Sequence, residues 1–273
     1  MRKYKPKDHG ENRMKNEGDV ILARENFYEF KNKNLEFLIR KRFSWMNKFI
    51  NKNHQGIEVG CGTGVSKEYI KNDNYMISDF SEHNFLDYKN IDALNTGFKD
   101  ESFDFVVSSN MIHHVPYPMK FFNEMHRILK SEGLLIIQEI NCSYMMMKLL
   151  RLMRHEGFDF TIDVYDSNLI CTDEDDLWSA NCAIPNLLFD NILKFEKNVP
   201  CFKVIKSSHS EFFNFINSGG VISKTFYLPL PYFLLKLINK VDQFLCFFSP
   251  NFFSLQRQIV LKKNETFNNN SLL

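Results

Sequence analysis

The sequence predicts a doubly wound α/β fold, with a mostly parallel, seven-stranded sheet covered by helices on both faces. Between residues 56 and 140, short segments rich in β-branched and aromatic residues alternate with segments of helical periodicity. The short segments are apolar at consecutive positions, which is typical of strands buried on both faces of a parallel sheet. A chain of 273 residues is long enough for one large domain of this class.

Helix and strand signals follow one another in a regular order up to residue 140. Apolar residues at three- and four-residue steps predict a helix from Glu25 to Ile50. A second helix is expected from Val65, and a third ends near Lys130, where the run Ser-Glu-Gly at 131–133 would stop it. The expected strands lie at 56–59, 75–79, 90–92, 103–108 and 134–140.

Beyond residue 140 this alternation ends, and residues 154–186 show little periodicity. We predict a flexible N-terminal tail at 1–24 and a single domain at 25–273, into which residues 141–200 are inserted as a substrate cap. The elements expected in this half are helices at 145–153 and 231–248 and strands at 201–206 and 256–261.

Composition and charge exclude several classes of protein. The net charge is +1 and the sequence pI is near 7.6, without the basic stripe that nucleic-acid-binding proteins usually carry. The first residues are too polar for a signal peptide, and no segment has the ~20 consecutive apolar residues of a membrane span. We therefore expect a cytoplasmic enzyme with a small-molecule substrate, no nucleic-acid partner and no membrane span.

The six cysteines do not have the spacing of a zinc finger or of a redox pair. Cys171, Cys182, Cys201 and His209 could in principle converge on a metal ion. Their irregular spacing favours reduced thiols instead, so no metal is expected.

The most informative motif is the run Gly-Cys-Gly-Thr-Gly from Gly60 to Gly64, between an expected strand and an expected helix. Glycines let the backbone turn sharply and approach a ligand closely. Glu58 lies two positions before the run. A carboxylate there suits a cofactor that carries a sulfonium and an ammonium group, such as S-adenosylmethionine, and would oppose a pyrophosphate.

Two further carboxylates follow the next two expected strands. Asp79 lies nineteen positions after Gly60, where a carboxylate can accept hydrogen bonds from both hydroxyls of a ribose. Asp92, followed by Ala93, is placed to accept a hydrogen bond from the amino group of adenine. Each alone is compatible with a solvated surface carboxylate, but their order on consecutive strands favours a cofactor site.

With these motifs, residues 56–140 resemble the class I S-adenosylmethionine-dependent methyltransferases, in particular the small-molecule branch called type 11. Residues 103–115 are similar to the fourth-strand motif of that branch, and residues 129–133 to its L-K-P-G-G turn, with Ser131 and Glu132 in place of Pro and Gly. The resemblance covers about a third of the chain. It implies a Rossmann-like fold and S-adenosylmethionine as the cofactor, with S-adenosylhomocysteine as its product.

The resemblance also implies which residues bind this cofactor. They are Glu58, Gly60, Cys61 and Gly62 toward its methionine end, Asp79 at the ribose, Asp92 and Ala93 at the adenine, and Asn110 facing the cofactor from the end of the fourth strand.

His113 and His114 directly follow the fourth strand, at the sheet edge where ligands bind in such folds. If the acceptor is a hydroxyl, an imidazole there could remove its proton, so either histidine is a candidate general base. The alternative is that one of them packs the loop against Pro116. His155 and His209 are weaker candidates.

The acceptor is expected to be recognised in the cap, by His155, Trp178 and Asn181. An aromatic face among hydrogen-bonding groups suits a sugar or a glycan precursor, nucleotide-linked or phosphorylated, although Trp178 could instead pack the cap onto the core. The helices at 145–153 and 231–248 could border an apolar tunnel for a quinone or lipid-linked acceptor, but packing in the core or in a homodimer is the more frequent explanation of such apolar faces.

Three other functions are alternatives to a small-molecule methyltransferase. A nicotinamide oxidoreductase expects G-x-G-x-x-G, whereas Val65 occupies the position of the last glycine. The N/D-P-P-Y/F motif of nucleic-acid amino-methyltransferases is replaced by Asn-Met-Ile-His at 110–113. A non-catalytic protein that binds S-adenosylmethionine stays an alternative.

Overall fold

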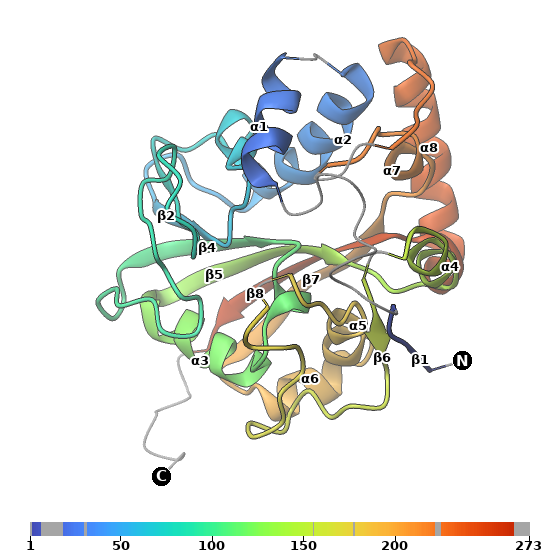
Figure 1. Ribbon diagram of the computed structural model, residues 1–273. Coiled ribbons are helices and arrows are strands. Elements are labelled where there is room, and N and C mark those ends of the chain that lie inside the picture. Colours follow the sequence, from blue (N-terminus) through green and yellow to red (C-terminus); the bar gives the residue numbers. More distant parts are fainter. Residues whose placement is uncertain are drawn as a thin grey trace.

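The computed structural model describes residues 2–6, 19–29, 32–154, 156–176, 178–221 and 225–264. Its centre is a six-stranded sheet in the order β3-β2-β4-β5-β8-β7, with helices on both faces (Figure 1). The strands are β2 (Gln55–Val59), β3 (Asn74–Ile77), β4 (Phe103–Ser109), β5 (Leu129–Ile140), β7 (Phe202–Ser210) and β8 (Gln256–Lys263).

The pairing of these strands is doubly wound. β2 lies between β3 and β4, and the three strands together with β5 are parallel neighbours. β8 runs antiparallel between β5 and β7. The predicted doubly wound, mostly parallel sheet is therefore confirmed, but in the described part of the chain it has six strands instead of seven.

The expected strand at 90–92 does not form. The chain before it runs beside the end of β3, where the backbone N–H groups of Asp87 and Tyr88 donate to the carbonyl of Ile77 (3.1 and 3.2 Å) and Ser78 and Tyr88 form an isolated bridge. The carboxylate of Asp87 accepts the hydrogen bond from the backbone N–H of Ile77 (2.7 Å), and Asn90 has a φ of 56°, outside the β region. The Asp87 side chain thus binds the N–H of Ile77 at the edge of β3, a group that a seventh strand would otherwise have paired with its backbone.

Helices cover both faces of the sheet (Figure 1). On one face lie α1 (Val20–Glu29), α2 (Lys33–Ser44) and α8 (Tyr232–Phe248), and on the other α3 (Pro118–Ile128), α5 (Ile184–Phe189) and α6 (Ile192–Asn198). The remaining elements are α4 (Tyr144–Met153), α7 (Phe213–Ile216), α9 (Pro250–Phe253), the 3-10 turns η1 (Met46–Lys48), η2 (Val65–Glu68) and η3 (Ile112–His114), and the paired strands β1 (Lys3–Tyr4) and β6 (Phe158–Asp159). Among the helices that the structure describes, none combines the length and apolarity needed to cross a bilayer.

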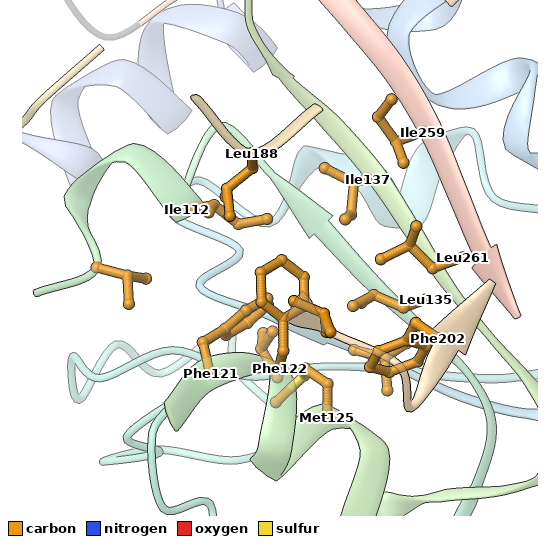
Figure 2. Close-up of a cluster of buried hydrophobic side chains, with 14 of the residues drawn as sticks. Ile112, Phe121, Phe122, Met125, Leu135, Ile137, Leu188, Phe202, Ile259 and Leu261 are labelled. Carbon is orange, nitrogen blue, oxygen red and sulfur yellow. The ribbon is translucent and has the colours of Figure 1, made fainter. Parts of the chain in front are cut away.

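The larger core lies between the sheet and α3. Phe121, Phe122 and Met125 of α3 have no exposed surface, and they face Leu135 and Ile137 of β5 (Figure 2). Burial of each such side chain is worth about 1.5–3 kcal/mol. This cluster fixes α3 under the sheet and, with it, the turn that joins β4 to α3.

A smaller core on the opposite face joins α2 to the sheet. Leu35 and Ile39 of α2 pack in one cluster with Ile77, Val107 and Ile136, which come from β3, β4 and β5. This cluster seats α1 and α2 above the carboxyl ends of β2 and β3.

The predicted helix at 25–50 is divided into α1, α2 and η1. Asn32 begins α2, because its side chain accepts hydrogen bonds from the backbone N–H groups of Asn34 and Leu35 (3.0 and 3.2 Å). The predicted flexible tail at 1–24 is corrected in part, since Lys3–Tyr4 pairs with β6 and α1 begins at Val20.

Two other boundaries differ from the prediction. The helix expected from Val65 is only the turn η2. The helical hydrogen-bond pattern ends there because the backbone N–H of Lys71 donates to Asn47 Oδ1 (2.7 Å) instead of to a carbonyl of the preceding turn. Residues 131–133, expected to stop a helix, lie inside β5, where Glu132 has a φ of 63°. Residues 141–200 comprise α4, β6, α5 and α6, and their role as a substrate cap stays a prediction.

Candidate active site

The candidate site lies where the strand order reverses. From β2 the chain continues to β3 on one side, while β4 flanks β2 on the other side. Ligands of doubly wound sheets bind at the carboxyl ends of the strands at such a point. Here the glycine run from Gly60 to Gly64 follows β2, and Asn110 follows β4.

The glycine run forms a loop whose backbone requires glycine. Gly60, Gly62 and Gly64 have φ values of 65°, 52° and 64°, a region that side chains with a Cβ disfavour. A Cβ at Gly60 would lie 2.5 Å from Cγ of Met111. At Gly62, by contrast, nothing lies within 4 Å of the Cβ position. The loop thus packs tightly on Met111 at its start and presents open backbone at its middle.

Asp79 faces this open part of the loop. Its Oδ2 accepts a hydrogen bond of 2.8 Å from the backbone N–H of Gly62, and its Oδ1 accepts from the N–H and the hydroxyl of Ser81. Between these two, the backbone N–H of Cys61 donates to the carbonyl of Ser78 (3.1 Å). The loop after β2 and the carboxylate after β3, predicted to form one site, therefore lie together.

Glu58 is buried beneath the loop, with 1% of its surface exposed. Its Oε2 accepts hydrogen bonds from the hydroxyls of Tyr75 (2.9 Å) and Ser66. Burial raises the pKa of Glu58 to about 7, and the nearby charge of Asp79 also raises it, against the two hydrogen bonds. Glu58 therefore changes its charge near neutral pH. Burial also raises the pKa of the neighbouring Cys61 thiol, which stays neutral.

Asp92 and Ala93 lie in the loop that replaces the expected third strand. Asp92 is exposed, and its Oδ1 accepts the backbone N–H of Leu94 (2.8 Å). Ala93 is half-buried against the core under the sheet. Their contact with adenine stays a prediction.

Arg24 of α1 is a site residue that the sequence did not indicate, because it lies in the predicted tail. Its guanidinium donates a hydrogen bond of 2.5 Å to the carbonyl of Thr63 in the glycine loop. The same group lies 4.2 Å from the ring centre of Phe85. Arg24 therefore fastens α1 onto the glycine loop. The one feature of the sequence that could have indicated Arg24 was the helical periodicity of the residues beside it.

Asn110 is held by a chain of buried amides that crosses the sheet. Trp45 Nε1 donates to Gln138 Oε1 (3.0 Å), Gln138 Nε2 to Gln256 Oε1 (3.0 Å), and Gln256 Nε2 to Asn110 Oδ1 (2.9 Å). Gln138 and Gln256 are buried. The backbone N–H of Asn110 also donates to the carbonyl of Gln138 (2.7 Å), and its φ is 50°. The side-chain oxygen of Asn110 is thus engaged, and the residue has a fixed, unusual backbone conformation at the carboxyl end of β4.

The two predicted histidines lie side by side on η3, with ring centres 4.2 Å apart. Nδ1 of His113 is 2.7 Å from Oε2 of Glu139 on β5, and Nδ1 of His114 is 3.0 Å from the carbonyl of Ser179. The Nε2 atoms of both rings face the carboxylate of Glu156. Neither glutamate was singled out from the sequence as a site residue, because they lie 26 and more than 40 positions away along the chain.

The two imidazoles titrate differently. Burial would lower the pKa of His113, but the negative charges of Glu139 and Glu156 and the hydrogen bond to Glu139 raise it. Burial and the neighbouring His113 lower the pKa of His114 to about 4. At neutral pH His114 is uncharged.

The three predicted acceptor residues have different positions. Trp178 lies edge-on to His114, with ring centres 6.2 Å apart, and is half-exposed. Asn181 is buried, and its amide binds the backbone of Asp159 and Ala183 instead of facing open space. Its predicted contact with substrate is therefore corrected to a role in holding the segment that follows His114. His155 lies outside the described residues.

The geometry fits S-adenosylmethionine. The open backbone at Gly62 would admit the ligand without a Cβ in its way, and Asp79 beside it offers carboxylate oxygens to ribose hydroxyls. Glu58 beneath the loop can supply a negative charge toward a cationic ligand.

Comparisons with known proteins agree with this geometry. A family described as "Methyltransferase domain" matches residues 57–137, which run from β2 to β5. No curated protein sequence matches the chain.

Among solved structures, an S-adenosylmethionine-dependent methyltransferase from Archaeoglobus fulgidus is similar, at 15% identity and a TM-score of 0.52, over 87% of this chain and 98% of that one. A possible histamine N-methyltransferase from Thermotoga maritima is 17% identical with a TM-score of 0.48, over 90% of this chain and 99% of that one. At such low identity the first of these supports the fold alone.

Proposed function

We propose that this chain is a class I methyltransferase that uses S-adenosylmethionine, and that it methylates a hydroxyl or amino group of a small, polyhydroxylated acceptor, such as a sugar or a glycan precursor. The observation that carries the proposal is the position of Trp178 beside His114, at the carboxyl edge of β4. A half-exposed indole next to hydrogen-bonding groups suits the apolar face of a sugar ring.

Bound at the glycine loop, S-adenosylmethionine would supply an electrophilic methyl group next to a good, neutral leaving group. The task left to the protein is alignment, which can supply roughly 7–11 kcal/mol when two reactants are held in line. Gly62 would admit the cofactor, Asp79 would orient its ribose, and Arg24 holds α1 over the loop.

Four consecutive acidic residues, 173–176, precede Trp178, and the first three are exposed. Their charges would repel a phosphate and attract an amine. A nucleotide-linked or phosphorylated sugar, if it is the acceptor, therefore points its phosphate away from this loop. An amino sugar matches the acidic surroundings best.

The role of His113 or His114 as a general base stays a prediction. Both Nδ1 atoms are engaged, so only the Nε2 atoms, which face Glu156, could take a proton. An amine attracted by the carboxylates of residues 173–176 arrives protonated and must lose a proton before it attacks, and a hydroxyl would gain about 10²–10⁴-fold from a base.

The experiment is a screen for S-adenosylhomocysteine release with amino sugars, nucleotide sugars, sugar phosphates, simple amines and quinones. The proposal expects turnover with a polyhydroxylated acceptor, and expects Trp178→Ala to raise the KM for that acceptor while the Kd of S-adenosylhomocysteine stays unchanged. Tyr144→Ala, an exposed aromatic residue on α4, is the matched control and should change neither value. Turnover with quinones alone would overturn the proposal.

A second candidate acceptor is a quinone or a lipid-linked molecule, favoured by the exposed side of α8. Large apolar side chains with more than half of their surface exposed recur there at helical spacing, and they are Phe233, Leu237, Phe244, Phe247 and Phe248. Such a face suits a lipid surface. Co-sedimentation with lipid vesicles that Phe244→Ser and Phe248→Ser abolish would support it, whereas a homodimer through this face in sedimentation experiments would contradict it.

A further inference from the structure

A compact group of potential metal ligands lies where the turn after β4 meets the segment after α4. The ligand atoms of His113, His114 and Glu156 all lie within 4.8 Å of one another. Nε2 of His113 is 3.7 Å from one oxygen of the Glu156 carboxylate, and Nε2 of His114 is 3.9 Å from the other. Both distances exceed the usual range of a hydrogen bond. They are close to the roughly 3.4 Å that separates two donors on a tetrahedral ion with bonds of about 2.0–2.1 Å.

Each imidazole is oriented through its other nitrogen. Glu139 holds Nδ1 of His113 at 2.7 Å, and this carboxylate is itself fixed by the backbone N–H groups of Ile112 (2.8 Å) and Ile140 (2.7 Å). The carbonyl of Ser179 holds Nδ1 of His114 at 3.0 Å. An Nδ1–H that donates to a carboxylate or a carbonyl leaves the Nε2 lone pair directed outward, and metal-binding histidines are held in this way.

A fourth donor lies next to the group. The Cys182 thiol donates a hydrogen bond of 3.1 Å to Oε2 of Glu156, and Cys182 has no exposed surface. Its sulfur is not part of the group of three, so this thiol would have to exchange its hydrogen bond for a bond to the ion. Two imidazoles, a carboxylate and a thiolate are ligands that zinc accepts in four-coordinate sites. His113 and Glu156 are also buried, at 3% and 8% exposure. A closed set of four protein ligands is typical of a structural zinc site, whereas a catalytic site keeps one position open.

We infer that His113, His114 and Glu156 bind a zinc ion, with Cys182 as the fourth ligand. The ion clamps the segment around residues 156–182 onto the turn that follows β4, and so fixes the wall of the site that carries Trp178. Because the Nε2 atoms cannot bind zinc and accept a proton from a substrate at the same time, this role replaces the general base. This zinc site depends neither on the identity of the acceptor nor on turnover.

The test begins with the wild-type chain, stripped with a chelator and titrated with Zn²⁺ alone by calorimetry. The expected result is one tightly bound Zn²⁺ per chain and a rise in Tm upon its addition. With Co²⁺ in place of Zn²⁺, the intense visible bands of a tetrahedral site should appear, together with a sulfur-to-cobalt charge-transfer band that Cys182→Ser removes. A stripped wild-type chain that binds no Zn²⁺ overturns the inference, and so does an octahedral cobalt spectrum.

Variants then locate the site. Glu156→Gln and His113→Gln should each weaken Zn²⁺ binding at least a hundredfold, and Glu139→Gln, which removes only the group that orients His113, by about 10–100-fold. The matched control is His209→Gln, on β7, which should bind Zn²⁺ as the wild type does. If the ligand variants do not fold, X-ray absorption of the zinc-loaded wild type decides, since it must show two imidazole ligands. Zn²⁺ binding that survives in folded ligand variants also overturns the inference.

Discussion

Asn110 and Gln256 lie 146 positions apart along the chain, and a hydrogen bond of 2.9 Å from Gln256 Nε2 to Asn110 Oδ1 joins them at the carboxyl edge of the sheet. Gln256 also accepts from Gln138, so the end of β4 is supported by β5 and by β8 together. Asn110 has a φ of 50°, a conformation that carries strain unless its surroundings hold it. The position of this candidate site residue therefore depends on a strand that is distant in sequence.

Replacement of Gln256 by Leu should weaken both stability and cofactor binding. The buried Nε2 of Gln138 and the Oδ1 of Asn110 would each lose a partner, at a cost of about 1–3 kcal/mol in the free energy of unfolding. We expect the Kd of S-adenosylhomocysteine, measured by calorimetry, to rise several-fold. Gln258→Leu, two residues along β8 and half-buried, is the control and should leave that Kd unchanged. Equal losses from both variants would refute a special role for the amide chain.

Replacement of Gly62 by Ala should affect the ligand more than the fold. The positive φ of Gly62 makes a Cβ there cost roughly 1–2 kcal/mol, but no neighbour lies within 4 Å to be displaced. Gly97→Ala is a matched control, with a φ of 71° and equally open surroundings. We expect similar decreases in Tm from both changes and a loss of S-adenosylhomocysteine binding from Gly62→Ala alone. Unaltered binding by Gly62→Ala would remove this glycine from the cofactor site.

The stability of the folded chain should fall as the pH rises toward the raised pKa of Glu58. The pKa of this carboxyl is raised from 4.5 to about 7 in the folded chain. Between pH 4.5 and pH 7 the folded state holds a proton on Glu58 that the unfolded state has lost. The contribution of protonated Glu58 to the free energy of unfolding is therefore full below pH 4.5 and is lost as the pH rises through about 7. The shift corresponds to roughly 3 kcal/mol. Glu58→Gln has no charge to bury, so its Tm relative to wild type should rise between pH 5 and pH 8.

The titration of Glu58 should also change the affinity for the cofactor. A cationic ligand favours ionised Glu58, so binding of S-adenosylmethionine by the wild type should tighten as pH rises through about 7. In Glu58→Gln this dependence should be absent. Parallel pH profiles of the Kd for the two proteins would show that Glu58 does not sense the ligand.

Replacement of Arg24 by Ala should loosen α1 from the glycine loop. The variant loses the hydrogen bond to the Thr63 carbonyl and the contact with the Phe85 ring, the latter worth about 0.5–2 kcal/mol. We expect weaker binding of S-adenosylhomocysteine and faster amide hydrogen exchange in α1. Arg40→Ala removes an exposed arginine of α2 that pairs with Glu36, and it should affect neither measurement. Unchanged hydrogen exchange in α1 would show that Arg24 does not hold this helix on the glycine loop.

The sequence allowed the prediction of those features that depend on neighbours in the chain. Strand periodicity located β2, β4 and β5, and the glycine run with Asp79 could be assigned because both directly follow strands whose carboxyl ends must meet. The seventh strand was wrong because the Asp87 side chain replaces one ladder hydrogen bond of β3. A single-residue substitution of this kind does not alter the apolar pattern.

Contacts between distant segments could not be predicted. Arg24 lies 39 positions from Thr63, and Glu139 lies 26 positions from His113. Glu156 meets both histidines only because the segment after α4 folds back against the turn after β4. Asn181 was expected to contact substrate, but its amide completes backbone hydrogen bonds that exist only in the folded protein.

The antiparallel position of β8 has a consequence for folding during synthesis on the ribosome. Of the strands that the structure describes, β8 is synthesised last, yet it lies inside the sheet, between β5 and β7. On the ribosome, β7 would emerge without its only neighbour in the sheet, and β5 would keep one side unpaired until residue 263 has left the exit tunnel. The hydrogen bond from Gln256 to Asn110 can form only in that same step, so the end of β4 lacks this support until β8 has left the exit tunnel.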